Sequence, residues 1–77
     1  MSELDLVVLL KPFAEHGLQI GDVGTVVHRY GDDHASEVEF VDADGNTIAV
    51  VTLEDSEVRP PSAGEILHVR EVSTAAS

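Results

Sequence analysis

The chain has 77 residues, no cysteine and a formal net charge of −11, from 15 acidic and four basic residues. This length limits it to one domain, and the lack of cysteine excludes disulfides and thiolate metal sites. Four scattered cations cannot match a phosphate backbone or an anionic lipid surface, which argues against nucleic-acid and membrane partners.

The first half of the chain predicts two strands. Residues 4–10 form an apolar, β-branched run that stops at Lys11-Pro12, as a buried strand would. Residues 13–18 read as a loop in which Gly17 can adopt a positive φ. Residues 25–30 are rich in strand formers, and Gly24 just before them predicts a bulge or a sharp bend.

The middle of the chain predicts a hairpin. In residues 36–42, Glu37 and Glu39 alternate with Val38 and Phe40, which is typical of a half-exposed antiparallel strand. The Asp-Gly pair in residues 43–46 predicts a tight turn. Residues 47–53 return as a strand that is apolar on both faces, and we therefore expect it in the centre of the sheet.

The end of the chain is predicted in less detail. Residues 54–57 suit a single helical turn and residues 58–59 a short strand, before Pro60-Pro61. Residues 65–72 alternate as an edge strand does, with a short helix as the alternative. We expect a barrel domain over residues 1–61, and a C-terminal extension over 62–77 with this edge strand and then a disordered tail.

Five or six short strands with frequent turns predict a mainly β fold, a small antiparallel SH3-like barrel. Residues 1–10 lack the basic start and apolar length of a signal peptide, and no apolar run could span a bilayer. We therefore expect a cytoplasmic protein.

Catalytic chemistry finds no support in the sequence. The histidines, His16, His28, His34 and His68, lack metal-ligand spacing, although His28 and His68 could meet across strands. The pair Asp42 and Asp44 faintly resembles the start of a calcium loop, but the downstream acidic ligands are missing. No nucleophile elbow or phosphate loop occurs. We expect no enzymatic activity, no cofactor and no metal.

Five segments together resemble a small bacterial family, domain of unknown function 4926. The most specific part is Glu-His-Gly-Leu at residues 15–18 followed by Gly-Asp-Val-Gly-Thr-Val within the segment 21–27, and this segment also looks like the opening hairpin of SH3-like barrels. The other matching segments are residues 5–9, 38–42 and 47–49, so that the resemblance runs from Leu4 to Pro60.

The resemblance implies a compact SH3-like barrel whose gene sits in mobile or toxin–antitoxin-like neighbourhoods. It implies an antitoxin or immunity-type role and supplies no catalytic residues. Fold alone does not define function.

The main hypothesis is a non-enzymatic acidic protein-binding module that occludes a basic, toxin-like protein. The alternative is a structural or accessory subunit of a larger enzyme, or a protein that self-associates through an edge strand. The acidic charge can also serve solubility alone. The candidate partner-binding residues are Tyr30, Glu37, Glu39, Val41, Asp42, Asp44 and Glu54.

Overall fold

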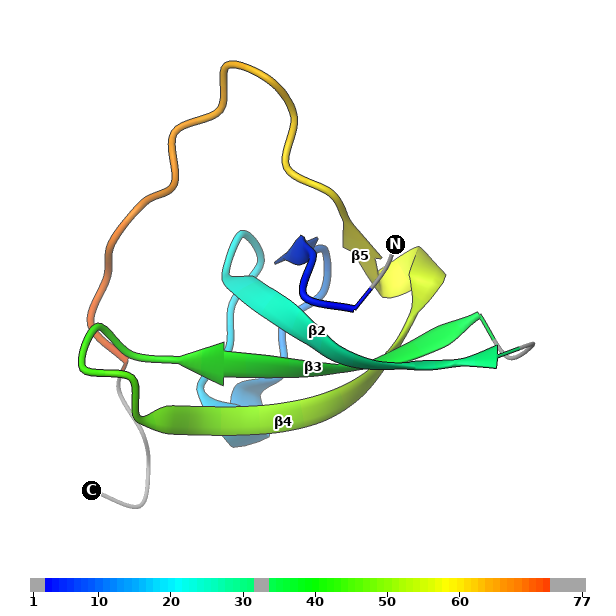
Figure 1. The fold of residues 1–77 in the computed structure, drawn as a ribbon. Coiled ribbons are helices and arrows are strands. Elements are labelled where there is room, and N and C mark those ends of the chain that lie inside the picture. Colours follow the sequence, from blue (N-terminus) through cyan, green and yellow to red (C-terminus); the bar gives the residue numbers. More distant parts are fainter. Residues whose placement is uncertain (1–2, 32–33, 73–77) are drawn as a thin grey trace.

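The computed structural model describes residues 3–31 and 34–72 (Figure 1). Five antiparallel strands form one sheet in the order β4-β3-β2-β1-β5. This confirms the prediction of a mainly β, antiparallel fold of short strands. The elements are β1 (Leu6–Leu9), the 3-10 turn η1 (Ala14–His16), β2 (Val23–Tyr30), β3 (Ala35–Val41), β4 (Thr47–Glu54), the 3-10 turn η3 (Asp55–Glu57) and β5 (Val58–Arg59).

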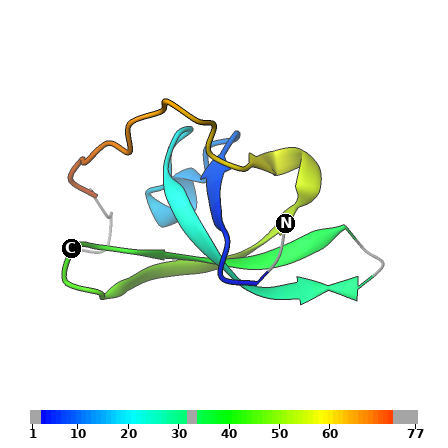
Figure 2. The ribbon, with the colours of Figure 1, turned by 45° about the horizontal axis from the view of Figure 1, so that its top comes forward.

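The sheet curls at β2, which pairs with two different strands along its length. Its first residues pair with β1, from Val8↔Val23 to Leu6↔Thr25, and its later residues pair with β3, from Thr25↔Glu39 to Tyr30↔Ala35. Figure 2 shows β2, β3 and β4 as one twisted layer, with β1 and the start of β2 standing across it. β4 and β5 are the two edges of the sheet, and no ladder between them closes the described strands into a barrel.

The core lies inside this curl and uses the inward-facing residues of every strand. The side chains of Leu9 and Val26 are fully buried, and Leu18 from the β1–β2 loop joins them. Phe13 packs against the same cluster. The other buried apolar residues of the core are Val7, Val38, Phe40, Ala49, Leu53 and Val58.

Gly24 is where the curl requires the absence of a side chain. A Cβ at this position would lie 2.5 Å from Cγ1 of Val38 and 2.9 Å from Cε1 of Phe40. Overpacking of that kind destabilises a core. The bend predicted at Gly24 is therefore a close approach of two strands, and the register shift falls further along, between Val26 and His28.

The prediction that residues 47–53 form a central strand was wrong, because β4 is an edge of the sheet. Ala49 and Leu53 face the core, and Ile48 and Val51 pack against it, whereas Val50 remains 48% exposed. The register shift between Phe40 and Val41 falls at Ile48, which has no partner in the β3–β4 ladder. After β4 the chain turns through η3 and crosses to β1, so no further strand is added beside β4.

The C-terminal segment, residues 60–72, contains no helix and no strand. The edge strand considered for residues 65–72 is not formed, and the segment instead arches along the side of β1 and the start of β2 (Figures 1 and 2). Arg59 holds the first part of this segment, because its guanidinium donates to both carboxylate oxygens of Glu65 at 2.8 and 2.6 Å. The tail predicted for residues 73–77 lies outside the described residues.

Candidate functional site

All four basic residues of the chain are engaged by separate carboxylates. Nζ of Lys11 lies 3.3 Å from an oxygen of Glu57, and the guanidinium of Arg29 donates to both oxygens of Asp55 at 2.6 and 2.8 Å. Arg59 pairs with Glu65 and Arg70 with Asp22. Four of the 15 acidic residues are thereby matched, and the surplus negative charge falls on the rest of the surface.

The side of the sheet opposite the core collects acidic and apolar residues in cross-strand rows. We call the outward side of β2, β3 and β4 the outer face. One row runs from Tyr30 through Ala35 to Glu54. The other rows are His28–Glu37–Thr52, Thr25–Glu39–Val50 and the pair Val41–Thr47.

The outer face brings together five of the seven residues proposed from the sequence. They are Tyr30, Glu37, Glu39, Val41 and Glu54. Strand alternation explains this, because residues two apart point to the same side and register aligns them with their neighbours. Val41 is 49% exposed, so the face offers apolar contact as well as charge.

Neighbouring hydroxyls orient the carboxylates of the outer face. The hydroxyl of Thr47 donates to Glu39 at 2.6 Å, and the hydroxyl of Thr52 donates to Glu37. Partial burial, and after it the charge of Glu37, raises the pKa of the Tyr30 phenol. The ring of Tyr30 meets that of His28 edge to face, with 4.7 Å between centroids. Tyr30 therefore remains a neutral hydroxyl at physiological pH.

Asp42 and Asp44 lie at the β3–β4 turn rather than on the outer face. The Asp42 carboxylate accepts hydrogen bonds at 2.9 Å from the backbone N–H groups of Asp44 and Asn46. The hydrogen bond from the Asn46 backbone is the main reason why the pKa of Asp42 is lowered. Gly45 completes the turn with a φ of 84°. Asp42 is thus a turn-forming residue that stays charged, while the Asp44 side chain is exposed.

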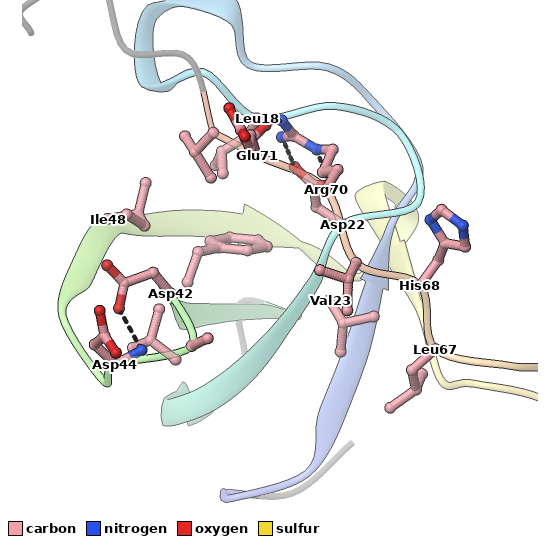
Figure 3. Close-up of a pocket in the computed structure, with 15 residues that line it drawn as sticks. Leu18, Asp22, Val23, Asp42, Asp44, Ile48, Leu67, His68, Arg70 and Glu71 are labelled. Atoms are coloured by element: carbon pink, nitrogen blue, oxygen red, sulfur yellow. Dashed lines mark hydrogen bonds and ion pairs between the residues drawn. The ribbon is translucent and has the colours of Figure 1, made fainter.

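Sequence reasoning missed an open groove of about 730 Å³ between the β3–β4 turn and the C-terminal segment. Figure 3 shows Ile48 and Asp42 on the hairpin side and His68 and Arg70 on the segment side. The floor comes from Leu18, Val23, Phe40 and Ile48. The sequence signal was the alternation of residues 65–72, which indicated an apolar segment but not the place where it lies.

Neither a metal centre nor a membrane span is found in the described residues. Within residues 3–31 and 34–72, no three histidine or acidic side chains gather in a way that could hold a metal ion. The same part of the chain has no helix that is long and apolar enough to cross a membrane. His28 lies on β2, where its ring meets Tyr30, and His68 lies in the C-terminal segment, where it lines the groove.

The fold defines a small antiparallel β protein with an acidic outer face and an apolar groove. The model of the family described as "Domain of unknown function (DUF4926)" matches residues 3–60, and the chain belongs to this family. The match ends one residue after β5, so it covers the sheet and excludes most of the C-terminal segment. Neither a search of curated proteins nor a search of solved structures found a significant match.

Proposed function

We propose that the chain is a non-enzymatic protein-binding module whose outer face binds a basic protein. The observation that supports this most is the concentration of Glu37, Glu39 and Glu54 on one side of β3 and β4. Each lysine and arginine of the chain is paired elsewhere, with Glu57, Asp55, Glu65 or Asp22. No lysine or arginine therefore neutralises the carboxylates of this face, which leaves their charge available to a basic partner, although the carboxylate of Glu54 also caps η3 by accepting from the Glu57 backbone.

Two contributions would make such a face bind. Long-range attraction from the surplus negative charge speeds encounter with a basic partner, and salt screens it. Apolar contact from Tyr30, Val41 and Val50 then slows dissociation, because burial of such groups stabilises a complex. These residues lie on paired strands, so that binding through them does not require a loop to become ordered.

The particular role that the family resemblance implies is that of an antitoxin or immunity-type protein. In that role the module would occlude a basic, toxin-like protein in the cytoplasm. Occlusion needs only a surface that covers the partner's own site, and no catalytic group on this chain takes part.

Self-association through β4 is the second candidate. β4 is an edge strand of eight residues, and Thr47 to Leu53 carry no charged side chain. Natural proteins usually protect such edges with charge or proline. A second copy could therefore add its own β4 to this edge. Sedimentation at increasing protein concentration tests this candidate: a constant monomer mass contradicts it.

A capture experiment tests the main proposal. The full chain, immobilised, is exposed to an extract of its own source cell at low and at high salt. We expect a basic protein to be retained at low salt and released at high salt. A Glu37→Gln/Glu39→Gln variant should retain several-fold less of it, because glutamine keeps an acceptor for Thr52 and Thr47 but removes the charge.

A charge-matched variant provides the control. Asp5→Asn/Glu15→Gln removes the same charge from two exposed positions that belong neither to the outer-face rows nor to the lining of the groove. Retention should stay near that of the unmodified chain. Equal losses in both double variants would contradict a role for the outer face, and retention of no basic protein would contradict the proposal itself.

A further inference from the structure

The groove beside the C-terminal segment has an apolar floor that the segment does not fill. Phe40 and Ile48 belong to the core or pack against it, and both line the groove. The segment leaves the groove open, because Leu67 and Val69 line it while remaining 55% and 88% exposed. The groove has a volume of about 730 Å³. This volume lies within the range of roughly 300–1,000 Å³ that is typical of ligand pockets.

One wall of the groove is fixed by Arg70. Its guanidinium donates to the carboxylate of Asp22, at 2.8 Å through Nε, and to the carbonyl of Gly17, also at 2.8 Å. Burial alone would raise the pKa of Asp22, but the hydrogen bonds from Arg70 and from the Gln19 backbone leave it lowered. The pair thus stays ionised and holds the segment at a distance from the hairpin.

The charges around the groove are predominantly negative. Asp42 and Asp44 form the hairpin rim, with Glu71 on the segment (Figure 3). Arg70, the one lysine or arginine among the lining residues, is neutralised by Asp22. An occupant that suits this arrangement has an apolar side chain for the floor and positive charges for the rim.

We propose that this groove binds an extended peptide segment in which apolar residues alternate with lysine or arginine. An apolar side chain enters between the hairpin and the C-terminal segment, and the flanking cations reach Asp42 and Asp44. This inference rests on the proposed function, because it locates the anchor of the same basic partner. It adds that the partner presents an extended, mixed apolar and basic stretch.

A titration followed by NMR tests the proposal on the full chain. The probe is a nine-residue peptide of alternating lysine and leucine. We expect saturable shifts of the backbone amides of Phe40, Ile48 and Leu67. A lysine–serine peptide of the same length should bind at least tenfold more weakly, and a glutamate–leucine peptide should leave these amides unchanged.

Two variants separate the groove from the outer face. Asp44→Asn, at an exposed position, should weaken the lysine–leucine peptide about three- to fivefold, the size expected for one rim charge. Val69→Ser, also exposed, should weaken it less, by about twofold. The Glu37→Gln/Glu39→Gln variant should bind the peptide within twofold of the unmodified chain. The amide spectrum of each variant verifies that the fold is retained.

Three results would overturn the proposal. Shifts confined to β2–β4 outer-face amides would remove the groove as the site while leaving the acidic face as a binding surface. Equal binding of the lysine–serine peptide would show that charge alone acts. An absence of shifts would end the groove proposal, whereas the capture experiment with the Glu37→Gln/Glu39→Gln variant decides the proposed function independently.

Discussion

Strand β3 and the C-terminal segment have similar sequence patterns but different structures. Both alternate apolar and polar residues, yet Val38 in β3 is fully buried and Ile66 in the segment is 89% exposed. β3 lies between β2 and β4 and pairs with both. The described part of the segment pairs with no strand, and Arg59 and Arg70 hold it through Glu65 and Asp22.

This contrast shows that alternation by itself does not specify a strand. A strand needs a neighbour that offers its backbone N–H and C=O groups, and a core that its apolar face can cover. In the sheet both conditions hold. In the segment, polar contacts fix the path of the chain and leave its apolar side chains to the surface. Four predictions test this contrast.

The largest expected effect comes from truncating one large apolar side chain in each region, Leu9 in the sheet and Ile66 in the C-terminal segment. Leu9→Ala should lower the free energy of unfolding by about 2–5 kcal/mol, because it leaves a cavity in the core. Ile66→Ala should change it by less than about 0.5 kcal/mol, because that side chain is in water. Urea denaturation followed by circular dichroism measures both. Similar losses for the two variants would contradict the contrast.

Alanine substitutions at two glycines test the close approach of β2 and β3 in the curl. Gly24→Ala should cost about 1–3 kcal/mol, because the new Cβ would meet Val38 and Phe40. Gly31→Ala is the control, since nothing lies within 4 Å of a Cβ built there. The same denaturation experiment compares them. A Gly24→Ala protein as stable as the control would show that β2 and β3 do not approach as closely as described.

Removal of the arginine clamp should release the segment and leave the sheet intact. In Arg70→Gln the hydrogen bonds to Asp22 and Gly17 are lost. We expect the heteronuclear NOE values of residues 67–72 to fall towards those of a free chain, while those of Val26 and Val38 stay unchanged. Lys11→Gln, which breaks only the pair with Glu57, should affect neither region. Unchanged values in Arg70→Gln would mean that other contacts hold the segment.

The smallest effect is a pH dependence confined to the segment. Hydrogen bonds from Arg59, and after them from the Ser62 backbone, lower the pKa of Glu65 from 4.5 to about 2. A carboxyl whose pKa is lowered by folding stabilises the folded form above its ordinary pKa and loses this effect as pH falls through the lowered value. Attachment of this part of the segment should therefore be complete above about pH 4.5 and weaken towards pH 2.

The Ser62 amide, which donates to Glu65, reports this titration directly by NMR. Its midpoint should lie well below 4.5, and Arg59→Gln should move it upward. A midpoint at 4.5 in the unmodified chain would contradict the Arg59–Glu65 pair.

Much of the fold was predictable from the sequence because local patterns and local structure agree. The alternation of Glu37 and Glu39 with Val38 and Phe40 predicted β3 and its outer face. The Asp-Gly pair predicted the turn that Gly45 completes with its positive φ. Gly17, expected to allow a positive φ in its loop, adopts 71°. In these places one or two residues decide the conformation.

What could not be predicted depends on contacts between distant parts of the chain. The position of β4 at the edge follows from the path of η3 and β5, which its own residues do not encode. The groove exists because Arg70 reaches Asp22, 48 residues earlier. Five of the seven residues proposed from the sequence for partner binding lie on the outer face. Asp42 instead stabilises the turn, through hydrogen bonds that the sequence did not reveal.

The central claim is that the outer face binds a basic partner through its carboxylates. Its most direct test is calorimetric titration of the captured basic protein into the full chain and into the two double variants at low salt. Glu37→Gln/Glu39→Gln should weaken binding about tenfold, through loss of two interfacial charges, and Asp5→Asn/Glu15→Gln should weaken it less than twofold. Equal affinities for the two double variants would contradict the claim.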